Sequence, residues 1–304
     1  MSSPATCREA DDLLTQFVRD HRLPDEYRQL ATEYWLPLSN RLASMFDGHT
    51  LVVGINGAQG TGKSTMAAAL AMFLGNLHDL KTVVISIDDL YLTRAERSEM
   101  ARVLHPMFQT RGVPGTHDLQ LAMALIRALK AAGSESDIAI PRFDKAVDDR
   151  RPEAAWHHHH GRVDIILFEG WCVGTTAEPA TQLKQPINRL EADEDAQGIW
   201  RSHVNASLAG EYSQLNAMID FLVLLQAPDF ETVYAWRGLQ EEKLRASMPD
   251  GTHLMDQGAL ARFIQHYERL TRHNLATLPQ LADVVFSLDK RHCIRRVRYR
   301  EGVS

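Results

Sequence analysis

The chain has 304 residues and a formal net charge of −6, from 33 basic and 39 acidic side chains with histidine neutral. With 44% hydrophobic and 24% charged residues, it has the composition of a folded globular protein, and disorder is excluded as a description of the whole. The mild acidity argues against broad nucleic-acid binding, which depends on clustered cations. No stretch approaches the roughly 18 apolar residues of a membrane span. We therefore expect neither nucleic acid nor membrane as a partner.

Cysteine usage and the first residues bear on the cellular compartment. Cys7, Cys172 and Cys293 lie far apart and are odd in number, which suits neither a disulfide framework nor a metal site. The first residues do not combine a basic region with an apolar one, as a secretory signal would. These observations favour reduced thiols and a cytoplasmic location.

The first part of the chain predicts helices followed by a strand, a helix and a second strand. Apolar side chains recur at helical spacing in residues 8–47, so residues 1–48 are expected to form a helical extension packed on the rest of the protein. A β-branched run predicts the first strand at residues 50–55. An alanine-rich segment predicts a helix at residues 64–74, and a second strand is expected at residues 82–87.

The rest of the chain continues this alternation of strands and helices. Strands are expected at residues 163–168, 221–225 and 282–288, and helices at residues 119–132 and 260–275. Strands that are apolar almost throughout and alternate with helices indicate an α/β fold, with a mainly parallel sheet covered by helices on both faces.

Two long segments, residues 88–118 and 141–162, do not follow this alternation and are rich in charge, His, Pro and Gly. Both lie next to strands, and in open α/β sheets ligands bind beyond the carboxyl ends of the strands. Irregular segments this long are uncommon in compact domains unless they are functional or disordered. We therefore favour substrate recognition here over the alternative of plain solvated loop.

The segment GAQGTGKS matches the phosphate-loop pattern G-x-x-x-x-G-K-[ST] at every fixed position, between a predicted strand and a predicted helix. Its backbone N–H groups and the helix N-terminus form a cradle for phosphate. We expect Lys63 to reach the β- and γ-phosphates of ATP and Ser64 to place its hydroxyl on Mg²⁺. Asn56 is expected to order the turn and Thr65 to support the loop or helix. The predicted nucleotide-binding residues of this segment are Gly57, Ala58, Gln59, Gly60, Thr61, Gly62, Lys63, Ser64 and Thr65.

A phosphate loop alone does not separate a kinase from a GTPase switch or a mechanical ATPase. The sequence contains no N-K-x-D motif, which a GTPase would need to read its base, and no repeats of the kind that accompany motor or transporter ATPases. The carboxylates at the strand ends instead favour a kinase.

Asp88 and Asp89 follow the second predicted strand, and Tyr91 lies two residues further on. An aspartate at this position reaches the γ-phosphate region, where it accepts the proton of an attacking alcohol or binds Mg²⁺ through water. We favour Asp88 as the general base. The alternative is that Asp88 or Asp89 caps the next helix.

Glu169 ends the strand expected at residues 163–168. A carboxylate that closes an apolar strand holds the position of a Walker B acid, which binds the metal directly or through water. Burying it there without a cation would be costly. We therefore predict Glu169 as a metal ligand together with Ser64, the alternative being a glutamate turned to solvent.

Six motifs together resemble the D-glycerate 3-kinases of the plant and fungal type. They are VVGINGAQGTGKST (52–65), ISIDDLYLT (85–93), RGVPGTHDL (111–119), PRFDKA (141–146), LFEGW (167–171) and VYAWRGLQEEKLR (233–245). That family is related to phosphoribulokinase, uridine kinase and bacterial pantothenate kinase, which are P-loop kinases acting on small-molecule alcohols. The resemblance implies a three-layer P-loop NTPase fold with a helical lid and ATP-dependent phosphorylation of the 3-hydroxyl of D-glycerate.

The resemblance also implies roles for individual residues. Asp88 matches the family's strand-end aspartate, the catalytic base, and Glu169 matches its Walker B-like acid. Four potential cations lie in motifs that relatives use around the acceptor pocket, and cations suit an acceptor that carries a carboxylate. We expect two of these four to touch the substrate, the alternative for each being a surface charge or a salt bridge. The predicted substrate-binding residues are Tyr91 and the four cations Arg111, His117, Arg142 and Lys145.

The motif at residues 233–245 resembles the lid helix of this kinase group, and a lid is expected at about residues 232–258. Such a lid closes over the phosphates, excludes water and brings an arginine to the transferring group. Arg237 and Arg245 lie eight residues apart, about two helical turns, and so share one face. We expect Arg237 to act in catalysis and Arg245 to bind nucleotide. The alternative is a solvated helix with an ion pair between Glu241 and Arg245.

Two further segments have open interpretations. The four histidines at residues 157–160 have the side chains of a transition-metal site, but consecutive residues of an extended loop point in alternating directions, so we expect a solvated connector. The basic stretch at residues 291–300 is either a final strand with outward cations or a contact for adenine and phosphate.

The sequence as a whole predicts one P-loop kinase domain at residues 49–304 behind the helical extension. We expect transfer of the γ-phosphoryl group of Mg-ATP to an alcohol of a small anionic acceptor, with D-glycerate as the first candidate. Two alternatives stay open. One is a kinase for another small alcohol, such as pantothenate, a nucleoside or a sugar phosphate, and the other is a non-catalytic regulatory ATP-binding protein. No oligomeric state follows from the sequence.

Overall fold

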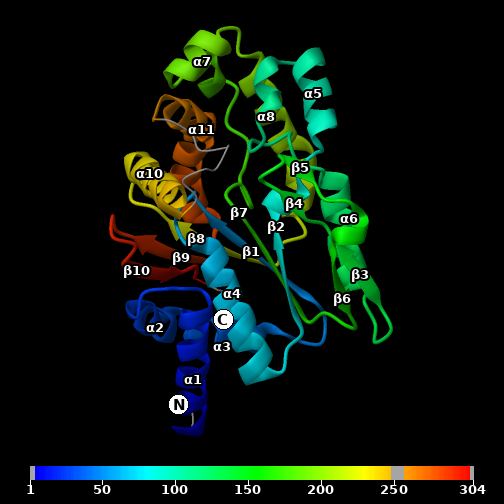
Figure 1. The fold of residues 1–304 in the computed structure, drawn as a ribbon, viewed down its shortest axis with the longest axis vertical. Helices are drawn as coiled ribbons and strands as arrows, with labels where there is room; N and C mark the ends of the chain where they lie inside the picture. The colour runs from blue at the N-terminus through cyan, green and yellow to red at the C-terminus, as the bar shows by residue number, and fades with distance from the viewer. Residues whose placement is uncertain (1–3, 248–256, 302–304) are drawn as a thin grey trace.

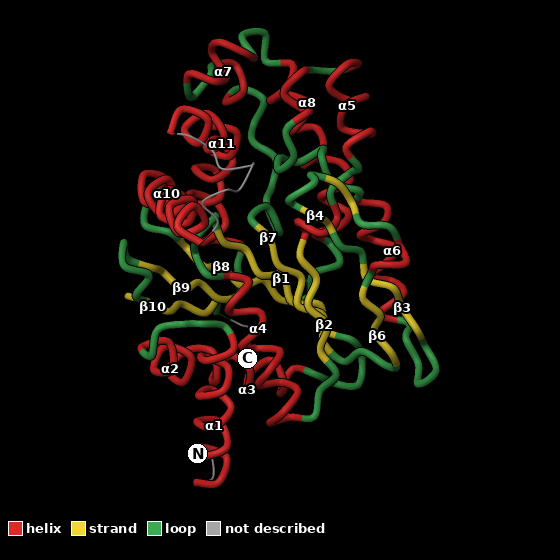
Figure 2. The backbone as a smooth tube through the Cα atoms, viewed as in Figure 1, coloured by secondary structure: helices red, strands yellow, loops and turns green. Residues whose placement is uncertain are grey.

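The computed structural model describes residues 4–247 and 257–301, which are built around one six-stranded sheet (Figures 1 and 2). The strand order is β10-β9-β8-β1-β7-β2. The strands are β1 (Leu51–Gly57), β2 (Thr82–Ser86), β7 (Ile165–Gly170), β8 (Phe221–Gln226), β9 (Val284–Leu288) and β10 (Ile294–Tyr299). The first five run parallel, and β10 pairs antiparallel with β9. The prediction of a mainly parallel α/β sheet is confirmed.

Helices cover both faces of this sheet, as Figure 2 shows. They are α1 (Pro4–Asp20), α2 (Glu26–Leu30), α3 (Leu36–Met45), α4 (Lys63–His78), α5 (Arg94–Val103), α6 (Leu119–Lys130), α7 (Arg189–Glu194), α8 (Ile199–Ser207), α9 (Ser213–Asn216), α10 (Phe230–Ser247) and α11 (Gln257–Leu281). None of these helices, within the described residues, is long and apolar enough to cross a bilayer.

The central strands are buried on both faces because their side chains alternate between two apolar cores. On β7, Ile165 and Leu167 join the core that contains α1, α3 and α4, whereas Ile166 and Phe168 join the core that contains α6, α8 and α11. A strand with two buried faces needs apolar residues on both, and β7 has them at Ile165–Phe168 before it ends at Glu169 and Gly170.

The helical extension shares a core with the sheet. Leu14 of α1 and Leu38 of α3 are fully buried in the same cluster as Phe73 of α4 and Val53 of β1. A short π-helix, Ala31–Trp35, joins α2 to α3. The helices expected at residues 8–47 are therefore present, with one interruption between α1 and α2.

Several elements differ from the sequence-based expectation. Residues 88–118 contain α5, which begins with a capping box formed by Thr93 and Glu96. The expected connector at residues 157–160 is instead the strand β6 (His157–His160), because β3 (Asp137–Ile140) pairs with it and satisfies its backbone. The basic stretch ends in strand β10, the first of the two alternatives.

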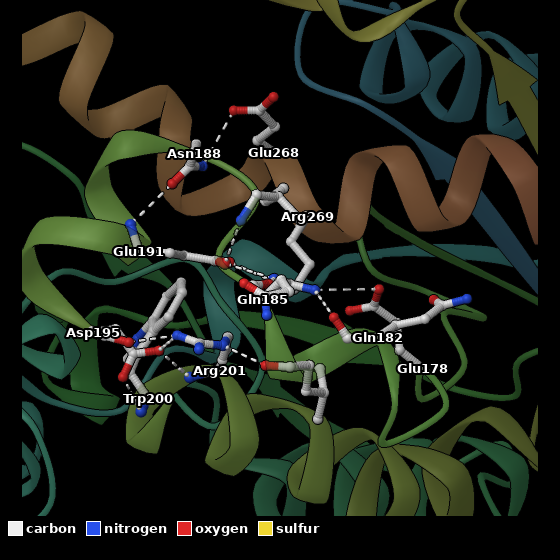
Figure 3. A network of polar contacts seen from close by, with 12 residues as sticks. Glu178, Gln182, Gln185, Asn188, Glu191, Asp195, Trp200, Arg201, Glu268 and Arg269 are labelled. Atoms are coloured by element: carbon white, nitrogen blue, oxygen red, sulfur yellow. Dashed lines mark hydrogen bonds and ion pairs between the residues drawn. The ribbon is translucent and has the colours of Figure 1, made fainter. Parts of the chain in front are cut away.

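Helices α7 to α9 belong to a long segment between β7 and β8 that was not expected to be helical. Figure 3 shows how buried ion pairs attach this segment to α11. Arg269 of α11 lies 2.6 Å from Glu191 and 3.6 Å from Glu178, and within the segment Arg201 lies 2.9 Å from Asp195. This network fixes one side of α11, whose other residues reach the cavity described next.

Candidate active site

The phosphate loop lies between β1 and α4, and its shape depends on glycine. Gly60 and Gly62 adopt φ values of +86° and +88°, in the left-handed region that other residues rarely enter. A Cβ at Gly60 would lie 2.8 Å from the Cβ of Trp236. Thr61 closes the loop because its hydroxyl donates to the carbonyl of Ala58 at 2.8 Å. The chain thus curls back just before the N-terminus of α4, the geometry that presents backbone N–H groups to phosphate.

A cavity of about 480 Å³ lies beyond the carboxyl ends of β1, β2 and β7, next to the phosphate loop. It is the position at which parallel α/β sheets bind ligands. The lining residues are Gln59, Gly60, Lys63, Ser64, Ser86, Asp88, Asp89, Tyr91, Arg111, Lys145, Glu169, Arg237, Phe263 and Tyr267. Apart from the glycines of the loop, nine predicted site residues line this cavity. They are Gln59, Lys63, Ser64, Asp88, Tyr91, Arg111, Lys145, Glu169 and Arg237.

Ser64 and Glu169 meet at one end of the cavity. The Ser64 hydroxyl donates to Oε1 of Glu169 at 2.8 Å, and Nζ of Lys63 lies 4.0 Å from Oε2. Glu169 is 4% exposed, and its Oε2 has no hydrogen-bond partner. A hydroxyl and a buried carboxylate with a free oxygen are the hard oxygen donors that Mg²⁺ prefers. The residues present therefore fit a magnesium site.

Asp88 also lines the cavity, in a 3₁₀ turn (Ile87–Leu90) directly after β2. Its Oδ1 accepts a hydrogen bond from the Tyr91 hydroxyl at 2.9 Å, and its Oδ2 accepts one from Nζ of Lys145 at 2.6 Å. Burial alone would raise the pKa of this carboxyl, but the charges of Lys145 and Lys63 together hold the pKa well below its usual range. Asp88 is therefore an ionised carboxylate that faces the phosphate-loop lysine.

Of the four predicted substrate-binding cations, two line the cavity and two do not. Arg111 and Lys145 line the cavity. Arg142 does not line it and instead lies 2.6 Å from Asp89. His117 lies behind Tyr91, with its ring stacked at 4.4 Å between centroids, and burial lowers its pKa to about 4.

Comparisons with known proteins show which family the chain belongs to. No protein-family model matches the chain. The chain is 34% identical over 231 residues to the uncharacterized kinase mug58 of Schizosaccharomyces pombe, covering 73% of this chain and 79% of that protein. It is 31% identical over 236 residues to the chloroplastic D-glycerate 3-kinase of Arabidopsis thaliana, covering 75% of this chain and 48% of that protein. The chain belongs to the family of P-loop kinases that includes D-glycerate 3-kinase.

The solved structures agree on the fold of this kinase. D-glycerate 3-kinase from Cryptococcus neoformans var. grubii superposes with a TM-score of 0.72 at 23% identity, covering 90% of this chain and 98% of that one. The predicted P-loop kinase fold is confirmed, and the protein is a phosphotransferase with an alcohol group as acceptor.

Helix α10, which contains the motif predicted to form a lid, is attached near its N-terminus to the phosphate loop. Trp236 stacks on His292 at 4.1 Å between ring centroids, and Nε2 of His292 lies 2.8 Å from the carbonyl oxygen of Gly60. Arg237, the next residue, lines the cavity with its guanidinium 5.7 Å from the centre of the Phe263 ring. The Arg245 side chain and residues 248–256 of the expected lid lie outside the described residues.

Sequence reasoning missed two aromatic residues that line the cavity and one that contacts His117 behind it. Phe263 and Tyr267 of α11 line the cavity, and the Tyr267 hydroxyl donates to the carbonyl of Arg111 at 3.2 Å. Tyr212 lies 2.5 Å from Nδ1 of His117. These residues belong to ordinary amphipathic segments, so no local signal in the sequence distinguishes them from core residues.

The prediction that Asn56 orders the phosphate-loop turn is wrong, and Trp171 lies beside the cavity without lining it. The amide of Asn56 donates to the carbonyls of Trp171 and Val173, so it orders the chain after β7 instead of the phosphate-loop turn. Trp171 is buried and donates through its ring N–H to the carbonyl of Gly112. It supports the cavity wall from behind.

Proposed function

We propose that this kinase transfers the γ-phosphoryl group of Mg-ATP to the 3-hydroxyl of D-glycerate. The observation that carries the proposal is the arrangement of Asp88, Lys145 and Arg111 around one cavity next to the phosphate loop. Such a cavity offers a proton acceptor for an alcohol and two cations for a carboxylate in the same small molecule. The name of the Arabidopsis relative supports the same acceptor.

The phosphate loop and Lys63 would hold the β- and γ-phosphates of ATP. Ser64 and Glu169 would hold Mg²⁺, which when bound offsets phosphate charge. Asp88 would accept the proton of the attacking hydroxyl, because it is ionised and faces the cavity. Arg237 at the base of α10 would approach the transferring group from the lid side, and the Arg245 side chain is proposed as a nucleotide contact on the strength of the resemblance.

An acceptor panel tests the proposal directly. ADP release by the purified protein with Mg-ATP is measured alone and with D-glycerate, L-glycerate, pantothenate, uridine and ribulose 5-phosphate. We expect stimulation by D-glycerate, with 3-phospho-D-glycerate identified as the product by mass and by its coupling to a phosphoglycerate-specific enzyme. Stimulation by another acceptor alone would replace the substrate, and ATP binding without stimulation by any acceptor would contradict the proposed transfer.

A further inference from the structure

Lys145, which lines the cavity, belongs to a hairpin, residues 142–150, that contains β4 (Phe143–Asp144) and β5 (Asp149–Arg150) and lies beyond the end of β2 (Figure 1). Ion pairs attach this hairpin to the rest of the protein. Lys145 pairs with Asp88 at 2.6 Å, and Asp148 pairs with Arg111. These two ion pairs join the hairpin to the rest of the site, and a charged ligand can take the place of one partner in each pair.

Arg111 and Lys145, the two predicted acceptor cations that line the cavity, thus already contact a carboxylate of the protein. The Arg111 guanidinium pairs with Oδ1 of Asp148, and the Lys145 ammonium pairs with Oδ2 of Asp88. An acceptor carboxylate cannot gain the full attraction of either cation while these pairs persist. Binding of an anionic acceptor must therefore exchange partners.

Asp148 is held in place independently of Arg111. The side chain of Arg97 is fully buried, lies 3.0 Å from Oδ2 of Asp148, and donates to the Asp148 carbonyl at 2.6 Å. Arg97 also donates to the carbonyls of Leu92 and Gln109. Asp148 therefore keeps a cationic partner when Arg111 leaves it, which lowers the cost of the exchange.

Asp88 likewise keeps a partner when Lys145 leaves it, because the Tyr91 hydroxyl still donates to Oδ1. Its basicity would change, however. Lys145 is the strongest of the charges that hold the pKa of Asp88 low. A carboxylate released from this ammonium is a better proton acceptor.

This inference rests on the proposed function and concerns the same cavity. We propose that the carboxylate of the acceptor replaces Asp148 on Arg111 and Asp88 on Lys145, so that acceptor binding itself releases Asp88 to accept the proton. Asp148 is then a specificity-determining residue that occupies the anion subsite until the acceptor arrives. Small hydroxy acids can make the exchange, whereas uncharged alcohols and water cannot.

The transfer step balances within this scheme. The acceptor oxygen forms a bond to the γ-phosphorus as its proton passes to Oδ2 of Asp88. The bond between the γ-phosphorus and the β,γ-bridging oxygen breaks, and ADP leaves with that electron pair. Asp88 later returns its proton to solvent. Without an anionic acceptor Asp88 remains paired with Lys145, which limits activation of water and hydrolysis of ATP.

The Asp148→Asn variant tests the anion subsite, because asparagine keeps the size of the side chain but removes its charge. We expect KM for D-glycerate to fall about fivefold, the worth of one partly exposed ion pair, with kcat within twofold of wild type. Asp144→Asn is the matched control, since Asp144 lies on the same hairpin and pairs with Arg151 at 3.2 Å. KM should not change in the control. A merely structural role for Asp148 would raise KM, and an unchanged or raised KM overturns the inference.

The Lys145→Met variant tests the release of Asp88. We expect ATP hydrolysis without acceptor to rise severalfold, and glycerol, which lacks the carboxylate, to become a detectable acceptor. Transfer to D-glycerate should weaken through a higher KM. Lys130→Met is the matched control, since Lys130 pairs with Asp220 at 3.8 Å outside the cavity. Hydrolysis that is unchanged or lower in Lys145→Met overturns the inference.

The two levels of the proposal fail separately. If wild-type protein phosphorylates no small hydroxy acid, the proposed function fails. If it phosphorylates D-glycerate, but KM in Asp148→Asn is unchanged or raised, or ATP hydrolysis in Lys145→Met is unchanged or lower, only the partner exchange fails.

Discussion

The Ser64 hydroxyl lies 2.8 Å from Oε1 of Glu169, although the two residues are 105 positions apart in the sequence. They meet because β1 and β7 are neighbouring parallel strands, with Ile55 opposite Glu169 in the register. The phosphate loop that follows β1 and the carboxylate that closes β7 therefore reach the same end of the sheet. The candidate metal site is a consequence of strand pairing.

Glu169→Gln should weaken metal binding while leaving the fold intact, because glutamine keeps the contact with Ser64 and loses the negative charge. We expect the Mg²⁺ concentration for half-maximal activity to rise at least about tenfold. Activity measured against Mg²⁺ concentration checks this, with ATP affinity in excess chelator as the control. An unchanged Mg²⁺ requirement would remove Glu169 from the metal site.

Asp88→Asn should abolish most of the transfer without affecting ATP binding. Asparagine still accepts the hydrogen bond from Tyr91, but it cannot take a proton from the acceptor. We expect kcat to fall by about 10²- to 10⁴-fold, with the dissociation constant for ATP, measured by calorimetry, near that of wild type. Turnover close to wild type would exclude Asp88 as the base.

Alanine substitutions at two glycines of the phosphate loop distinguish the cost of backbone strain from the cost of a steric clash. Both have φ near +90°, but a Cβ at Gly62 meets nothing within 4 Å, whereas one at Gly60 meets Trp236 at 2.8 Å. Gly62→Ala should cost about 1–2 kcal/mol of unfolding free energy from the left-handed conformation alone. Gly60→Ala should cost more and displace the base of α10. If chemical denaturation shows equal losses of unfolding free energy in Gly60→Ala and Gly62→Ala, the side chain of Trp236 moves away from the added Cβ at little cost.

The buried ring of His266 should make stability depend on pH. Burial, with a smaller effect of Arg262, lowers its pKa from 6.5 to about 4, and its Nε2 has no hydrogen-bond partner. Between pH 6.5 and pH 4 the unfolded chain binds a proton that the native state does not bind. The contribution of the neutral His266 ring to the unfolding free energy is therefore complete above pH 6.5 and is lost as the pH falls toward 4.

From pH 7.5 to 5.0 this histidine should account for about 2 kcal/mol of lost unfolding free energy. In urea denaturation the unfolding free energy of His266→Leu should fall by about 2 kcal/mol less than that of wild type over this pH interval. The exposed control His49→Leu should show the pH dependence of wild type. Identical pH dependence in His266→Leu and wild type would contradict a neutral native ring.

Arg269 is the centre of the buried network in Figure 3, and its removal should destabilise the attachment of α7 and α8 to α11. Arg269→Met leaves Glu191 and Glu178 buried without their cation, at a cost of about 3–5 kcal/mol. Arg189→Met is the control, since Arg189 forms an exposed pair with Asp193 and should not measurably change stability. A small loss in Arg269→Met would mean that the two carboxyls become protonated or hydrated.

Much of the fold could be predicted because its signals are local. Apolar runs identified the parallel strands, and the glycine-rich loop with its flanking strand and helix identified the phosphate site. The strand β6 was missed because four consecutive histidines carry no apolar alternation, and only pairing with Asp137–Ile140 gives them a strand geometry. Helices α7 to α9 were missed because they are short and their burial depends on distant elements, such as α11 for α7 and α6 for α9.

By itself the sequence determined the kinase class and placed Asp88 and Glu169 at strand ends, because fixed spacing within short segments decides these features. Only the tertiary structure decided that Arg111 and Lys145 line the cavity while Arg142 and His117 do not. The sequence does not distinguish these four residues, and Arg111, Arg142 and Lys145 each pair with a carboxylate that only folding places beside them. That carboxylate comes from a distant part of the chain, as with Lys145 and Asp88, 57 residues apart.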